Sequence, residues 1–138
     1  MFSINYKVTV SDINYGGHMG NERALILFQQ GRIDFFKNLS LSEINIGDDI
    51  GTIQLDSHVK YLKEVYLGEI LKINIDEIVL KKTSMDFIYS VYNEKNEKVL
   101  EGSTLILAYN YERKKVSKIP PIFLEKLRNG EKYENTIK

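Results

Sequence analysis

The chain has 138 residues, a length that suits one domain with a substantial hydrophobic core. It carries 19 lysines and arginines against 19 aspartates and glutamates, so it has no overall positive field and nucleic acid is not expected as a partner. The chain contains no cysteine and only 2 histidines, which excludes disulfides and thiolate catalysis and leaves too few ligands for a structural zinc site. We therefore expect a single globular domain over residues 1–138, with no metal.

The expected location is cytoplasmic. No stretch approaches the roughly 20 apolar residues that a bilayer span needs, so membrane insertion is not expected. Residues 1–10 alternate polar and apolar side chains and lack a basic region followed by an apolar block. They therefore indicate a β-strand and not a signal peptide.

The chain begins with a predicted strand and continues with a predicted long helix. Apolar residues at every second position of the first segment share one side of that strand: Phe2, Ile4, Tyr6, Val8 and Val10. A glycine-rich turn follows. From about Asn21 to Leu39, apolar residues recur at helical spacing around much of the circumference. Gly31 inside this helix predicts a close backbone approach to a sheet.

The rest of the chain is predominantly strand-like. Alternating apolar residues predict strands within residues 53–62, 71–76, 87–91 and 105–108, with a hairpin connection at 93–98, a last pairing at Val116 and a short tail helix over 123–128. One strand, a long apolar helix and then antiparallel strands predict an α+β domain. Its helix is buried against one curved sheet of about five strands.

The turn between the first strand and the helix carries the most specific pattern. Asp12, Asn14, Gly17, His18 and Asn21 are spaced as in the motif Asp-x-Asp-x-x-Gly-His-x-x-Asn. This motif and the order of elements resemble the hotdog fold, and in particular the 4-hydroxybenzoyl-CoA thioesterase-like branch of acyl-CoA thioesterases. The similarity covers nearly the whole chain, including 61–68 and 113–121. It implies hydrolysis of an acyl thioester to free acid and coenzyme A, with no separate cofactor.

The sequence departs from the family pattern at Asn14. In many members of this branch an aspartate at that position acts as general base or nucleophile, and an amide can do neither at neutral pH. Two other carboxylates are candidates for the role: Glu22 in the first helical turn, which we favour, and Asp12. Asn14 would then orient water or the thioester, and His18 would support the turn or assist proton transfer.

Stabilisation of the oxyanion requires hydrogen-bond donors. Backbone N–H groups near Gly20, Asn21 and Glu22 would lie at the amino terminus of the helix. Unpaired donors and the positive end of the helix dipole converge there. The resemblance directs the acyl carbonyl oxygen at this terminus, with the Asn21 amide as leading donor. Asn21 is also expected to cap the helix.

Each of these residues also has a purely structural interpretation. Asp12 and Asn14 are common turn residues that satisfy backbone donors. Glu22 at a helix start is a favourable charge. His18 can bridge strand and helix through both ring nitrogens. Only their combination in one glycine-rich turn favours the functional interpretation.

The expected partners are a second copy of the chain and an acyl thioester. A single sheet around one helix leaves edge strands uncovered, which favours self-association. The resemblance implies a dimer or tetramer with active sites between subunits, and acyl-CoA or an acyl-carrier thioester as substrate. The phosphates of coenzyme A would meet lysines such as Lys60, Lys63 or Lys82.

Two alternative functions remain open. Asn14 in place of aspartate also suits a non-catalytic protein that binds acyl thioesters. A hotdog hydratase or dehydratase has the pattern Asp-x-Asn-Pro-x-His, which Asp12, Asn14 and His18 echo distantly. In this chain Tyr15 replaces the proline and the histidine comes one residue late.

Overall fold

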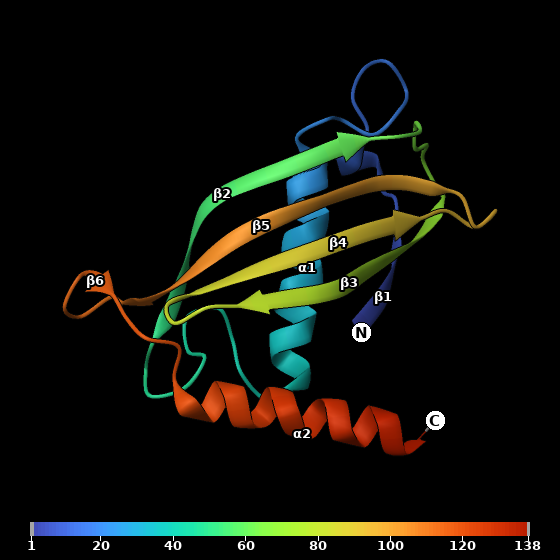
Figure 1. Ribbon diagram of the computed structural model, residues 1–138. Helices are drawn as coiled ribbons and strands as arrows, with labels where there is room; N and C mark the ends of the chain where they lie inside the picture. Colours follow the sequence, from blue (N-terminus) through green and yellow to red (C-terminus); the bar gives the residue numbers. More distant parts are fainter. Residues whose placement is uncertain (1, 138) are drawn as a thin grey trace.

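The computed structural model describes residues 2–137 and has the expected hotdog architecture. The elements in chain order are β1 (Phe2–Lys7), the short 3₁₀ turn η1 (Val10–Asp12), α1 (Arg23–Asn38), β2 (Gly51–Tyr61), β3 (Ile70–Leu80), β4 (Ser84–Tyr92), β5 (Lys98–Asn110), β6 (Lys115–Val116) and α2 (Pro121–Ile137). The predicted α+β class and the long helix against a curved antiparallel sheet are confirmed (Figure 1).

The sheet has the strand order β1-β3-β4-β5-β2, and β6 pairs with the end of β5. All neighbouring strands are antiparallel, and the sheet curves around α1 (Figure 1). α2 crosses beneath the C-terminal end of α1, where Phe123 packs against Phe36. None of the helices within residues 2–137 combines the length and apolar content of a membrane span.

The core lies between α1 and the concave face of the sheet. Phe28 of α1 is fully buried and stacks on Tyr89 of β4, with ring centroids 4.3 Å apart. Gly31 lies directly over β3, because a Cβ at this position would stand 3.3 Å from the Ile73 side chain. This contact confirms the predicted close approach of helix and sheet.

A buried arginine crosses this apolar core. Arg32 of α1 is only 4% exposed, and its Nη1 donates hydrogen bonds to the Tyr89 hydroxyl (3.0 Å) and the Thr104 hydroxyl (3.1 Å). Its Nε donates to Glu43 at 2.8 Å. Because each contact comes from a different segment, Arg32 ties the helix to β4, β5 and the loop before β2.

The predicted element boundaries differ from the structure in several places, and β3 runs on to Leu80. The first strand ends at Lys7, because Val10 starts η1 and is 79% exposed instead of sharing the apolar side. β5 begins at Lys98, well before residue 105, and α2 extends beyond 123–128 to Ile137. Gly102 interrupts the apolar alternation of β5 because its inward position has no room for a side chain, a Cβ there standing 2.2 Å from the His58 carbonyl oxygen.

Candidate active site

The motif turn runs from η1 to α1 as a small protruding loop. Ile13 and Met19 pair in an isolated β-bridge at its base, and the Asn14 N–H donates to the His18 carbonyl at 3.0 Å. Gly17 has φ +83°, a backbone conformation that side chains disfavour, so the glycine is needed to close the loop. The loop rises above the end of β2 (Figure 1).

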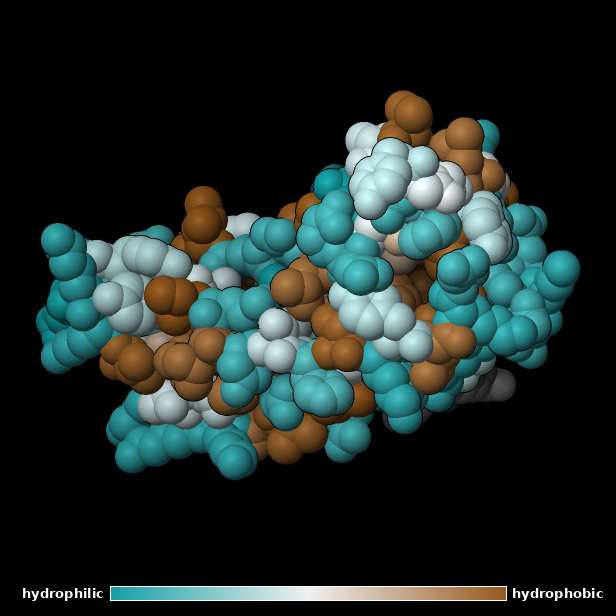
Figure 2. All heavy atoms as spheres, turned by 90° about the horizontal axis from the view of Figure 1, so that it is seen from above, coloured by the Kyte–Doolittle hydropathy of each residue, from teal (hydrophilic) through white to brown (hydrophobic). Residues whose placement is uncertain are grey.

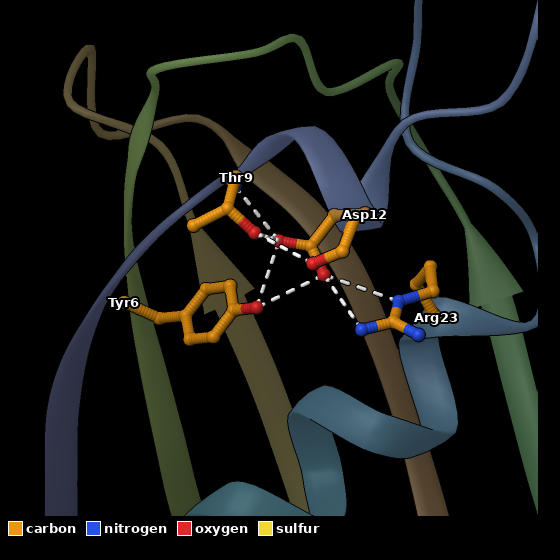
Figure 3. A network of polar contacts seen from close by, with 5 residues as sticks. Tyr6, Thr9, Asp12 and Arg23 are labelled. Atoms are coloured by element: carbon orange, nitrogen blue, oxygen red, sulfur yellow. Dashed lines mark hydrogen bonds and ion pairs between the residues drawn. The ribbon is translucent and has the colours of Figure 1, made fainter.

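Asp12 is buried on the inner side of this turn and is surrounded by donors. The Tyr6 hydroxyl lies 2.7 and 2.9 Å from its two carboxylate oxygens, and the Thr9 N–H donates at 2.9 Å. Arg23, the first residue of α1, donates through Nε at 3.1 Å and Nη2 at 2.9 Å. Figure 3 shows the carboxylate held between β1 and the start of α1.

These contacts give Asp12 a structural role. Burial alone raises the pKa of its carboxyl, but hydrogen bonds from Thr9, Tyr6 and Arg23 outweigh burial and lower the pKa below the usual value. The carboxylate is thus a weak base whose oxygens are already hydrogen-bonded. A catalytic role for Asp12 stays a prediction that this arrangement does not favour.

Asn14 is exposed and serves the loop itself. Its Oδ1 accepts a hydrogen bond from the Gly16 N–H at 2.9 Å, which is the Asx-turn geometry of a tight loop. The neighbouring Tyr15 is fully exposed. The proposed function of Asn14 in orienting water or substrate stays a prediction.

His18 and Met19 form a short backbone pairing with the segment that precedes β3. The Met19 N–H donates to the Val65 carbonyl at 2.7 Å, and His18 pairs with Tyr66 in a β-bridge. His18 is half-buried, and its Nδ1 lies 3.5 Å from the Met19 carbonyl oxygen. In the described residues it does not bridge strand and helix through both ring nitrogens.

The start of α1 differs in detail from the prediction. The helix begins at Arg23 with Glu22 at the N-cap position, so Asn21 is not its cap. The Gly20 N–H donates to the Asp12 carbonyl at 3.0 Å and is therefore not an oxyanion donor. The N–H groups of Asn21 and Glu22 take part in no hydrogen bond with residues 2–130, so they remain as the candidate donors.

Glu22 folds back over Gly20. A Cβ at Gly20 would stand 2.6 Å from Glu22 Oε1, so the glycine leaves the space that the carboxylate occupies. The side chain of Glu22 is exposed and makes no capping hydrogen bond. Its catalytic role stays a prediction.

A cleft of about 240 Å³ opens beside the helix start. It is lined by His18, Met19, Asn21, Tyr61, Leu62, Lys63, Glu64, Val65 and Leu100. The Tyr61 hydroxyl donates to the Asn21 carbonyl across it. The structure therefore brings the predicted His18 and Asn21 together with the end of β2, at a surface where hydrophilic and hydrophobic side chains mix when the molecule is seen from above (Figure 2).

The three candidate lysines do not gather at this cleft. Lys63 lines it and forms an ion pair with Glu97, whereas Lys60 lies with His58 at a second hollow, lined by residues of β2 to β5. Lys82 precedes β4 at the other end of the sheet. Because Ser84 pairs with Leu107 while Tyr61 pairs with Leu100, about 23 Å of β5 separate the two ends.

Sequence reasoning missed Tyr61 and Glu64 as site residues. Both lie in the 61–68 segment that carried the family resemblance, but spacing alone did not show that this segment folds against His18 and Met19. A signal was present in the sequence, since Val65 is an apolar residue that directly follows the charged pair Lys63 and Glu64, and it is 2% exposed in the structure.

The thioesterase-like superfamily model matches residues 8–127. The chain belongs to this superfamily. A relative in Bacillus subtilis (strain 168), the uncharacterized protein YsmA, is 28% identical over 113 residues, which cover 80% of this chain and 76% of that protein.

Solved structures of similar fold include thioesterases of coenzyme A esters. A 1,4-dihydroxy-2-naphthoyl-CoA thioesterase from Synechocystis superposes with a TM-score of 0.82 at 15% identity, over 91% of this chain and 93% of that one. A DHNA-CoA thioesterase from Staphylococcus aureus has a TM-score of 0.80 at 18% identity, over 99% and 94%. The protein SAV2348 of the same organism, solved in complex with CoA, has a TM-score of 0.80 at 18% identity, over 93% and 82%.

Proposed function

We propose that this member of the thioesterase-like superfamily hydrolyses acyl-CoA thioesters to a free acid and coenzyme A. The observation that carries the proposal is the cleft itself. His18 and Asn21 line it near the start of α1, where the N–H groups of Asn21 and Glu22 take part in no hydrogen bond with residues 2–130. The family match over residues 8–127 supports the same reaction.

The chemistry follows from the position of the helix start. Attack of water on the thioester carbonyl carbon creates an oxyanion, and the bond to sulfur breaks when that intermediate collapses. The N–H groups of Asn21 and Glu22, together with the positive end of the α1 dipole, would stabilise the oxyanion. Removal of one such donor typically costs about 100-fold or more in rate.

A panel of short, long and aromatic acyl-CoAs tests the proposal with a thiol reagent that detects released coenzyme A. The chain contains no cysteine, so the protein adds no thiol signal of its own. We expect release well above the rate without protein for at least one acyl group. Tight acyl-CoA binding without release would instead identify a non-catalytic binding protein, and hydration of an enoyl-CoA would identify a hydratase.

We infer that a second copy of the chain covers the β2 edge of the sheet. β2 is an edge strand of 11 residues, and Ile53 and Leu55 on it are 41% and 62% exposed. Ile26 and Ile33 of α1 are also exposed, at 40% and 42%. Apolar side chains beside a long unpaired edge favour association.

Sedimentation tests this association. We expect a dimer or a larger assembly of the purified chain and dissociation of the Leu55→Glu variant, with Leu80→Glu at the far end of β3 as the matched control. A monomeric natural chain at micromolar concentration contradicts the inference. In the assembly, Lys63 and Lys60 are the lysines proposed to meet the phosphates of coenzyme A, because Lys82 lies at the far end of the sheet.

A further inference from the structure

Hydrolysis needs an anion that takes a proton from water, and the motif position that supplies it in many relatives is occupied by Asn14. The structure offers three carboxylates around the turn: Asp12, Glu22 and Glu64. Their surroundings differ enough to separate them.

Asp12 and Glu22 are poorly placed for this step. The Asp12 carboxylate is buried and accepts hydrogen bonds from Tyr6, Thr9 and Arg23. The Glu22 carboxylate lies over Gly20 and is not among the residues that line the cleft. Of these three residues, only Glu64 lines the cleft.

The backbone fixes the direction in which Glu64 points. The Met19 N–H donates to the Val65 carbonyl, and His18 pairs with Tyr66, so residues 18–19 and 65–66 form a short antiparallel ladder. Side chains alternate across such a ladder. Met19 and Val65 enter the core at 7% and 2% exposure, which turns Glu64 and His18 to the same outer side.

The carboxylate of Glu64 is oriented but not neutralised. The Tyr66 hydroxyl donates a hydrogen bond to its Oε2, and this hydrogen bond, together with the charge of Glu64, raises the pKa of Tyr66. Tyr66 is itself held by hydrogen bonds of its backbone with Glu69. Among residues 2–130, whose side chains the structure describes, no lysine or arginine pairs with Glu64. Oε1 is therefore left to accept a proton from water.

We infer that Glu64 is the general base of the thioesterase and that it takes over the role of the aspartate missing at position 14. This inference rests on the proposed function. Glu64 accepts a proton from water as the water oxygen bonds to the carbonyl carbon. The oxyanion then collapses, the carbon–sulfur bond breaks, and Glu64 returns the proton to the sulfur of coenzyme A. The products are a carboxylic acid and a thiol.

The Glu64→Gln variant tests the inference, with Glu77→Gln on β3 as a matched control for the loss of one exposed carboxylate. We expect Glu64→Gln to lower kcat by about 100-fold or more with little change in KM, because general base catalysis contributes about that factor. The control should keep the natural rate. Both side chains are exposed, so both variants should melt at the temperature of the natural chain.

Two further readouts separate a base from a structural residue. The fall in kcat toward acid pH in the natural chain should disappear in Glu64→Gln, and formate should restore part of the rate of Glu64→Ala but not of Glu64→Gln. If the natural chain hydrolyses no acyl-CoA, the proposed function fails. If the natural chain is active and Glu64→Gln has the same kcat, the inference about Glu64 is wrong while the proposed function stands. The same holds if Glu22→Gln, and not Glu64→Gln, loses the activity.

Discussion

The two sides of the motif turn use their polar residues in opposite ways. On the inner side, Asp12 is buried, and Tyr6, Thr9 and Arg23 all donate hydrogen bonds to it. On the outer side, His18 and Glu64 line an open cleft, and Glu64 has one hydrogen-bonded oxygen and no ionic partner among residues 2–130. Asp12, which accepts the most hydrogen bonds, therefore fixes the turn, while His18 and Glu64, which have fewer partners, remain available to a substrate.

The largest effect on folding is expected from Asp12→Asn. The substitution removes the charge that compensates Arg23, so we expect a loss of about 2 to 4 kcal/mol in the free energy of unfolding. Urea unfolding measures the loss, with Asp76→Asn on the exposed face of β3 as control. A loss of less than 0.5 kcal/mol, as an order-of-magnitude bound for surface sites, would show that the inner side does not anchor the turn.

The pH dependence of stability should follow the same carboxylate. Because the folded-state pKa of Asp12 lies below its unfolded value, its contribution is complete above about pH 4 and is lost as pH falls through the folded-state pKa. The natural chain should therefore lose more stability on acidification than Asp12→Asn. Parallel curves for the two proteins would contradict the direction of this shift.

A smaller effect is expected from Tyr6→Phe. The variant loses the hydroxyl that donates to Asp12 but keeps the ring in place, so we expect a destabilisation of about 1 to 2 kcal/mol. In the Asp12→Asn background the same substitution should cost less, because the charged acceptor is gone. A double-mutant cycle measures this coupling, and strict additivity would show that the two side chains act separately.

The smallest effect is expected from Asn14→Asp, which puts a carboxylate on the exposed loop. An aspartate oxygen can still accept the Gly16 N–H, so stability should change by less than about 0.5 kcal/mol. The hydrolysis rate should stay within about threefold of the natural rate, since position 14 is not part of the cleft wall. A tenfold or greater rise in the hydrolysis rate, equivalent to about 1.4 kcal/mol, would show that a carboxylate at position 14 of the loop takes part in catalysis.

Local pattern predicted most of the fold. Helical spacing located α1 to within two residues at its start, and period-two alternation located the five strands β1 to β5. The end of the first strand and the beginning of β5 were wrong for physical reasons. The first strand was predicted too long because Val10 is apolar but lies exposed in η1. The start of β5 was predicted too late because Gly102 has no side chain at an inward position where the alternation needs an apolar one.

The site was predicted only where it is local in sequence. His18 and Asn21 line the cleft, as the motif indicated. Tyr61 and Glu64 lie near them because His18 pairs with Tyr66, 48 residues later in the chain, and no spacing rule describes such a pairing. The same limit applies to Asp12, because the groups around a carboxylate in space decide whether it can act as a base. The motif alone could not show that Tyr6 and Arg23 donate hydrogen bonds to the Asp12 carboxylate.

The hydroxyl of Tyr61 joins two structural tasks that are otherwise separate. Tyr61 is the last residue of β2 and hydrogen-bonds the Asn21 carbonyl two residues before α1 begins. A second chain that pairs with the β2 edge would therefore stabilise one wall of the cleft. Through the Tyr61 hydroxyl it would also hold in place the backbone N–H groups at the start of α1, which are the proposed donors to a bound thioester. If a second copy covers the β2 edge as proposed, loss of that contact would also lower the rate of the proposed hydrolysis.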